Sequence, residues 1–255
     1  METSTPLTLR YGPDPDQVGD LWLPAGSGPH PVAVVIHGGY WRAYYRRDLM
    51  DGLAADLAAR GWAAWNIEYR RVGADGGWPQ TFRDVACAID LLDLLADRHG
   101  LDRARIAAIG HSAGGQLGLW AAARPQLPAD APGADPIVVP TTVVSLAGVA
   151  DLRLAEELEQ GIHASAELLG GTPEQVPGRY GLASPRELLP LSVRQIVVHG
   201  DADVHVDPVI SARYVEAARA AGDPVESLRP AEADHFTLID PTSAVWGETM
   251  ALLGG

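Results

Sequence analysis

A serine between two glycines is the residue of this chain best placed for nucleophilic chemistry. Residues 110–114 read GHSAG and match the G-x-S-x-G pattern, with Ser112 at the centre. A strand-like run at residues 105–109 precedes the pattern, and a helix-like run at residues 116–123 follows it. A tight strand-to-helix turn of small residues lifts a serine hydroxyl above a sheet. This context predicts that Ser112 is the nucleophile of an acyl transfer rather than part of an ordinary glycine-rich turn.

Residues 37–41 (HGGYW) form a second glycine-rich segment, directly after a strand-like run at residues 32–36. Glycines at a strand end expose backbone N–H groups, which can stabilise the oxyanion formed during acyl transfer. Because the segment precedes the serine in the chain, the order this chemistry needs, we expect an oxyanion loop rather than a simple turn. The complementary donor is the N–H group of Ala113, which follows the nucleophile.

The acid of a serine triad is expected between the serine and the base. Asp201, Asp203 and Asp207 all follow a strand-like run at residues 195–199. We favour Asp203, because it lies a few residues past the strand end, where it can reach the serine turn. Asp207 precedes a proline and is expected to begin a helix, whereas Asp201 is expected to organise the turn. An EF-hand calcium loop is excluded, because positions 206 and 212 lack the glycine and glutamate it needs.

His235 is the predicted base, since it comes just after the last strand-like run, residues 225–228. The stretch between Asp203 and His235 is long enough for one helix and one strand, which would return the histidine to the same sheet edge. His205 is the rival base. No pair of histidines has a convincing metal-ligand spacing, so we predict neither a metal nor a cofactor.

The other reactive side chains have structural explanations. His37 and His199 each precede a glycine at a strand end and are expected to support the backbone by hydrogen bonding, and His111 fills the variable position of the serine turn. Cys87, the single cysteine, lies among apolar residues of a predicted helix over residues 81–95. We expect it to be a buried small hydrophobe rather than a nucleophile.

The elements that must position these residues alternate between strand and helix patterns. Strand-like runs occupy residues 7–11, 18–23, 32–37, 62–67, 105–109, 142–146, 195–199 and 225–228. Leucines spaced four apart, from Leu49 to Leu57, predict a helix that ends at Gly61, and a second helical pattern ends at Gly100. Such alternation predicts an α/β fold with a mostly parallel eight-stranded sheet and helices on both faces.

One long connection interrupts this alternation. Residues 151–190 lie between two neighbouring predicted strands and contain a helical pattern followed by glycine- and proline-rich turns. Connections of this length are usually lids or insertions. We therefore expect a single domain over residues 1–255 with a small cap-like insertion at about 151–190, and surface decoration is the alternative for that segment.

The composition excludes several classes of partner. The chain has 33 acidic and 19 basic residues, all of the latter arginine, and a net charge of −14. Nucleic acids and anionic membranes both bind basic surfaces, so we expect neither as a partner. The first six residues lack the apolar stretch of a signal peptide. A cytoplasmic protein that acts on a small-molecule ester or amide is expected, and a homo-oligomer is compatible with the sequence.

Taken together, these motifs resemble the α/β-hydrolase superfamily over nearly the whole chain. Residues 37–41 resemble the HGGxW signature of kynurenine formamidases (arylformamidases) and related esterases, and residues 66–70 (NIEYR) fit the same branch. The resemblance implies that Gly39 and Tyr40 supply oxyanion N–H groups together with Ala113. Tyr40 also places a side chain at the pocket rim, and Trp41 is expected to bind the substrate.

The resemblance implies a two-step acyl transfer by Ser112, Asp203 and His235. The function it favours is arylformamidase-like hydrolysis of N-formylkynurenine or a similar short-acyl compound. Two alternatives stay open: a general short-chain carboxylesterase, and a hydrolase fold retained as a non-catalytic binding module.

Overall fold

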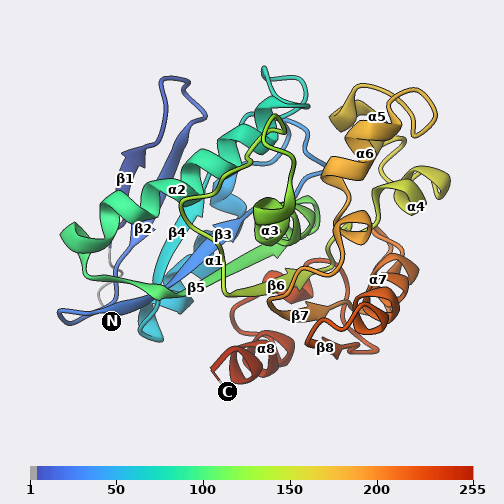
Figure 1. The fold of residues 1–255 in the computed structure, drawn as a ribbon. Helices are drawn as coiled ribbons and strands as arrows, with labels where there is room; N and C mark the ends of the chain where they lie inside the picture. The colour runs from blue at the N-terminus through green and yellow to red at the C-terminus, as the bar shows by residue number, and fades with distance from the viewer. Residues whose placement is uncertain (1–4, 255) are drawn as a thin grey trace.

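Eight strands form one sheet in the computed structural model, which describes residues 5–254 (Figure 1). They are β1 (Leu7–Arg10), β2 (Val18–Trp22), β3 (His30–Ile36), β4 (Ala63–Ile67), β5 (Leu101–His111), β6 (Thr142–Leu146), β7 (Arg194–Val198) and β8 (Val225–Leu228). The prediction of an eight-stranded α/β sheet is confirmed. The largest shift is at β5, which begins at Leu101 rather than at residue 105.

The strand order explains how distant segments meet. It runs β1-β2-β4-β3-β5-β6-β7-β8. β1 and β2 are antiparallel to their neighbours, whereas β4, β3, β5, β6, β7 and β8 are all parallel to one another. The sheet is therefore mixed, with a parallel majority. Because the carboxyl ends of parallel strands share one sheet edge, the segments after β3, β5, β7 and β8 all begin there. These are the four segments that carry the predicted site residues.

Helices cover both faces of the sheet (Figure 1). On one face lie α1 (Asp51–Ala59) and α8 (Ala244–Gly254), and on the other lie α2 (Gln80–His99), α3 (Ala113–Ala123) and α7 (Pro208–Ala220). Alternate strand residues point to opposite faces, so Val34 packs with α2 and α3 while Val35 packs with α1 and α8. Both faces being buried explains the continuous apolar runs of the central strands.

The helix ends agree with the glycine signals, but one buried residue was predicted wrongly. Gly100 ends α2 in the left-handed conformation, with φ of +62°. Cys87 is exposed rather than buried, because it lies on the same side of α2 as the exposed Arg83 and Leu94. The helix turns this residue away from the sheet.

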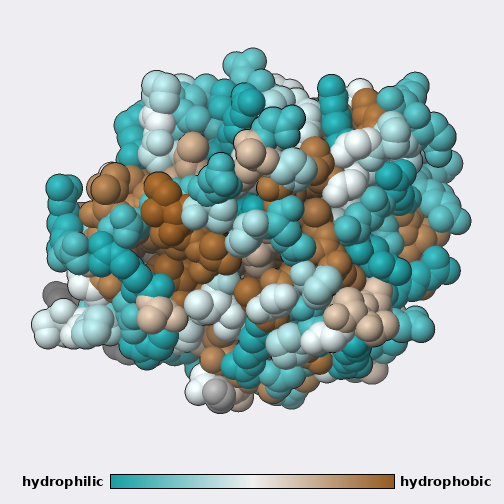
Figure 2. Space-filling model, viewed as in Figure 1, coloured by the Kyte–Doolittle hydropathy of each residue, from teal (hydrophilic) through white to brown (hydrophobic). Residues whose placement is uncertain are grey.

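In the view of Figure 1, the surface of the molecule is mainly polar, with an apolar area over α2 (Figure 2).

Residues 151–190 form three short helices and a 3₁₀ turn, which lie together next to α3 and α7 (Figure 1). They are α4 (Leu152–Glu157), α5 (Ala164–Leu169), α6 (Pro177–Ala183) and η3 (Pro185–Leu188). Side chains of α3 anchor the end of α6: Gln116 Nε2 donates to Ala183 O at 2.8 Å, and Trp120 Nε1 donates to Leu182 O at 3.1 Å.

Candidate active site

Ser112 is the single residue between the end of β5 and the start of α3. Its φ of +55° and ψ of −118° lie outside the regions that non-glycine residues ordinarily adopt, so the surrounding turn must hold it there. Gly110 and Gly114 make the turn sterically feasible, since a Cβ atom on Gly110 would lie 2.0 Å from the carbonyl oxygen of Gly114. The sequence GHSAG therefore folds as the strained strand-to-helix turn that its pattern predicts.

The loop after β3 leaves backbone donors free beside this serine. Gly39, Tyr40 and Trp41 all have positive φ, at +110°, +51° and +57°. Within residues 5–254, the N–H groups of Gly39, Tyr40 and Ala113 form no hydrogen bond. Gly39 and Tyr40 line the same pocket as Ser112, and Ala113 directly follows the serine. The three N–H groups expected to bind an oxyanion thus lack a protein acceptor.

A buried ion pair holds this loop in place. His37 donates from Nδ1 to Gly38 O at 2.8 Å and from Nε2 to Glu68 Oε1 at 2.9 Å, while the Tyr69 ring stacks on it at 4.3 Å. Burial would raise the pKa of Glu68, but the bond from His37 and the nearby Arg71 guanidinium hold that pKa below its ordinary range. The expectation that His37 supports the backbone is confirmed.

Asp203 and His235 are joined directly. Asp203 Oδ2 accepts a hydrogen bond from His235 Nδ1 at 2.6 Å, and Oδ1 accepts from the N–H groups of His205 and Val206 at 2.8 and 3.0 Å. Burial alone would raise the pKa of Asp203, but hydrogen bonds from His199, His235 and Val206 outweigh it and hold that pKa far below its ordinary range. The carboxylate is therefore ionised, and it fixes one nitrogen of the His235 ring as a donor.

His111 fixes the backbone of His235. Its Nε2 lies 3.0 Å from His235 O, an acceptor, so Nε2 carries the hydrogen, and the two rings are 4.4 Å apart. Burial and the neighbouring His235 lower the pKa of His111 to about 3, so its ring is neutral at ordinary pH. Residues 5–254 contain no hydrogen bond between Ser112 and His235. Such contacts often tighten only when substrate binds.

Ser112 and His235 open into one small pocket with a cavity volume of about 160 Å³. Its walls are mainly aromatic, and they consist of Gly39, Tyr40, Tyr45, Leu49, His111, His205 and Phe236. His205, the rival base, lies at this rim, but Asp203 bonds its backbone N–H rather than its ring. The acid pairs with the ring of His235.

Two expectations for neighbouring residues are wrong. Trp41 does not line the pocket: its side chain is 1% exposed, and its Nε1 donates to Gln116 Oε1 of α3 at 3.0 Å, so the ring lies in the core. Asp201 does not organise its turn: its carboxylate binds the Arg229 guanidinium at 2.6 Å, and Asp203 binds the turn's N–H groups instead. Asp207 does begin α7, accepting from Val209 N–H.

Several pocket residues were not predicted from the sequence. His111 and Phe236 are chain neighbours of Ser112 and His235, a signal that could have identified them. Tyr45 and Leu49 come from the segment between β3 and α1, and nothing in their pattern marks them as pocket residues.

The structure of residues 5–254 holds neither a three-residue metal cluster nor a membrane-crossing helix. Over residues 5–254 it has no cluster of three His, Cys, Asp or Glu side chains suited to a metal ion. No helix within the same residues has the length and apolar character needed to cross a bilayer.

Several known proteins resemble this chain, and those named here are esterases. The family model BD-FAE matches residues 20–217. The esterase LipC of Mycobacterium tuberculosis is 33% identical over 91% of this chain, and the esterase LipQ of the same organism is 29% identical over 84%. The chain spans 60% of LipC and 52% of LipQ.

Solved structures share the fold along the whole chain. A truncated carbohydrate esterase from gut microbiota superposes with a TM-score of 0.85 at 20% identity, covering 100% of this chain and 97% of its own. Esterase 2 of Thermogutta terrifontis, solved with propionate bound, superposes with a TM-score of 0.78 at 23% identity. The match covers 100% of this chain and 94% of the esterase chain. The fold of this chain is the α/β-hydrolase fold.

Proposed function

The chain belongs to the BD-FAE family, and from that premise we propose that it is a serine carboxylesterase acting on short-acyl esters. One observation carries the proposal. A single pocket brings together Ser112 on a strained turn and His235 backed by an ionised Asp203. The unpaired N–H groups of Gly39 and Tyr40 belong to the same pocket. This is the set of groups that acyl transfer through a serine requires.

Each group has a defined part in the proposed reaction. Ser112 Oγ attacks the ester carbonyl while His235 Nε2 accepts its proton, and Asp203 stabilises the charged ring through Nδ1–H. The N–H groups of Gly39, Tyr40 and Ala113 bind the oxyanion. The intermediate then collapses as His235 protonates the departing alcohol. Water, deprotonated by His235, releases the acid from Ser112.

The pocket dimensions support a short acyl group. A cavity of about 160 Å³ walled by Tyr40, Tyr45 and Phe236 has room for a few carbon atoms beside Ser112. A fold relative binds propionate, which agrees with this size. Long acyl chains would have to displace aromatic walls.

Residues 151–190 fit the part of a cap in this proposal. A Cβ atom on Gly161 would lie 2.5 Å from the Tyr40 ring, so the segment packs directly on a pocket wall. Gln160 Oε1 also accepts from Asp207 N–H at 3.0 Å, which ties the segment to the loop that carries Asp203. The segment thereby supports the Tyr40 wall of the pocket from outside.

Arylformamidase-like activity is the second candidate. The aromatic side chains of Tyr45 and Phe236 beside Ser112 suit a planar aryl leaving group, as N-formylkynurenine would present. The named relatives are esterases, so the ester proposal has the stronger support.

Two measurements test the proposal. Ser112 should react stoichiometrically with a fluorophosphonate probe, and Ser112→Ala should abolish labelling and lower kcat/KM by ~10³-fold or more with an unchanged circular dichroism spectrum. An unlabelled wild-type protein would support a binding module instead.

A substrate panel separates the two activities. p-Nitrophenyl acetate should be hydrolysed with a higher kcat/KM than the decanoate, and N-formyl anilides should react more slowly than the acetate. A preference for the decanoate would refute the small acyl pocket, and faster formamide hydrolysis would make the protein an arylformamidase.

A further inference from the structure

Asp203 has a second histidine neighbour that the proposed reaction does not use. His199 directly follows β7, and its Nε2 lies 3.2 Å from Asp203 Oδ2 and 3.0 Å from Val206 O. Its Nδ1 lies 2.6 Å from Ser211 Oγ on α7. His199 is 1% exposed, so these contacts are not shared with bulk water.

The surrounding atoms define which nitrogen of this ring donates. A carboxylate and a carbonyl can only accept, so His199 Nε2 carries a hydrogen, which bonds Val206 O and lies beside Asp203 Oδ2. Nδ1 lies 2.6 Å from the Ser211 hydroxyl, a contact that holds the ring plane in place.

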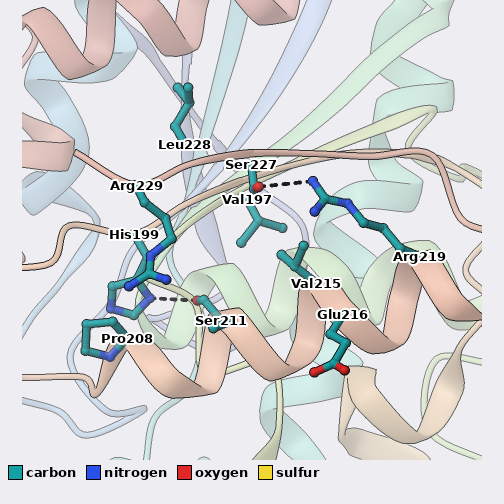
Figure 3. A pocket seen from close by; sticks show the side chains of 11 residues that line it. Val197, His199, Pro208, Ser211, Val215, Glu216, Arg219, Ser227, Leu228 and Arg229 are labelled. Carbon is teal, nitrogen blue, oxygen red and sulfur yellow. Dashed lines mark hydrogen bonds between the residues drawn. The ribbon is translucent and has the colours of Figure 1, made fainter. Parts of the chain in front are cut away.

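His199 lies outside the substrate pocket. Figure 3 shows it beside Ser211 in a separate groove between α7 and β8, whose cavity volume is about 380 Å³. None of the residues that line this groove lines the pocket of Ser112. A change at His199 therefore reaches the chemistry through Asp203 rather than through substrate contacts.

We propose that His199, oriented by Ser211, is a positioning residue that fixes the Asp203 carboxylate for its bond with His235. Its Nε2–H bridges Asp203 at one end of the acid loop and Val206 at the other, which locks the loop. The bond also draws negative charge from Oδ2, the oxygen that faces His235. This inference rests on the proposed esterase function.

The test replaces the donor while keeping the volume. His199→Phe should lower kcat on p-nitrophenyl acetate roughly 10–100-fold with KM within about twofold, because substrate contacts are intact. His199→Gln, which can still donate an amide N–H, should retain kcat within about threefold. Ser211→Ala should give an intermediate loss. An unchanged kcat in His199→Phe, or a loss confined to KM, would overturn the proposal.

A pH profile separates positioning from loss of packing. Without the His199 donor, Asp203 carries more negative charge and favours protonated His235, so the acid limb of kcat/KM should move to higher pH by roughly half a unit in His199→Phe. The other titratable groups near this pair, His111, His205, Tyr40 and Asp234, are the same in every variant. An unmoved limb alongside a lower kcat would indicate a packing role and overturn the proposal.

One readout is independent of esterase activity. The downfield proton resonance of His235 Nδ1–H should shift in Ser211→Ala and His199→Phe, and an unaltered resonance in both would overturn the proposal. If His199→Phe fails to fold, Ser211→Ala carries the test alone. If the wild-type protein neither hydrolyses esters nor reacts with a fluorophosphonate, the proposed function fails, while the resonance still reports on the contact between His199 and Asp203.

Discussion

Two of the histidine–carboxylate pairs in the molecule, His37–Glu68 and His235–Asp203, have similar short contacts and different surroundings. His37 and Glu68 are 2.9 Å apart, and both side chains are fully buried. His235 and Asp203 are 2.6 Å apart, and the His235 ring lines the pocket that contains Ser112. Distance alone does not separate the two pairs.

The two pairs differ in the second ring nitrogen of the histidine. Both ring nitrogens of His37 are engaged, one by Glu68 and the other by Gly38 O, so neither nitrogen is left for chemistry. The described residues offer no hydrogen-bond partner to Nε2 of His235, which belongs to the pocket. A histidine–carboxylate pair therefore suits catalysis only when one nitrogen is left unused and reachable. The predictions below test this division.

The largest expected effect is at the acid of the pocket pair. Asp203→Asn should lower kcat by ~10²–10⁴-fold, because the amide no longer stabilises the charged His235 ring. Steady-state kinetics on p-nitrophenyl acetate measures the loss, and thermal unfolding should show a folded protein.

Asp201→Asn is the matched control for that variant, since this carboxylate binds the exposed Arg229. It should stay within about twofold of wild type. A larger loss at Asp201 or Asp207 than at Asp203 would show that the wrong carboxylate has been assigned.

Breaking the buried pair of His37 and Glu68 should lower the stability of the protein rather than its activity. Glu68→Gln removes the buried carboxylate beside His37 and Arg71, although Arg71 keeps its ion pair with Asp16, so the change should cost about 3 kcal/mol of unfolding free energy at neutral pH. Urea denaturation measures this cost, and kcat per folded molecule should fall far less than in Asp203→Asn.

The pH dependence of that cost has a defined sign. The folded pKa of Glu68 lies below its ordinary 4.5, so its contribution is present above that value and is lost as pH falls through the folded pKa. The free-energy difference between wild type and Glu68→Gln should shrink in acid. A difference that stays constant down to pH 3 would contradict the ion-pair assignment.

The smallest expected effect is on the pH dependence of stability, and it concerns His111, whose ring lies 4.4 Å from that of His235. The pKa of His111 is about 3 in the folded protein against an ordinary 6.5, so the unfolded chain binds a proton first as pH falls. Wild type should lose about 2 kcal/mol more than His111→Gln between pH 6.5 and 5. Urea denaturation at both pH values tests this, and equal losses would count against a neutral, buried His111.

The sequence allowed the sheet and the order of the site segments to be predicted, because both follow from local patterns. Apolar runs identified the strands, and the residues after β3, β5, β7 and β8 meet at one edge in any parallel sheet of this order. Asp203 and His235 were predicted through that rule, whereas Ser112 was predicted from the G-x-S-x-G pattern.

The pocket walls could not be predicted in the same way, because they depend on backbone angles and helix phase. Trp41 and Tyr40 are adjacent and have similar positive φ values, yet the Trp41 side chain lies in the core and the Tyr40 side chain lies at the pocket. Tyr45 reaches the pocket because its ring packs against Gly39, where a Cβ atom would lie 2.8 Å from it. Cys87 faces solvent because of its angular place on α2.

The crowding of donors around Asp203 limits how protons can move during the proposed reaction. Four donors already point at its two oxygens: two backbone N–H groups and the rings of His199 and His235. A carboxylate with every acceptor position occupied has no place for an incoming proton. In the proposed reaction it acts as a fixed charge rather than a proton store. Each turnover then shuttles one proton at a time through His235 alone, between serine, leaving alcohol and water.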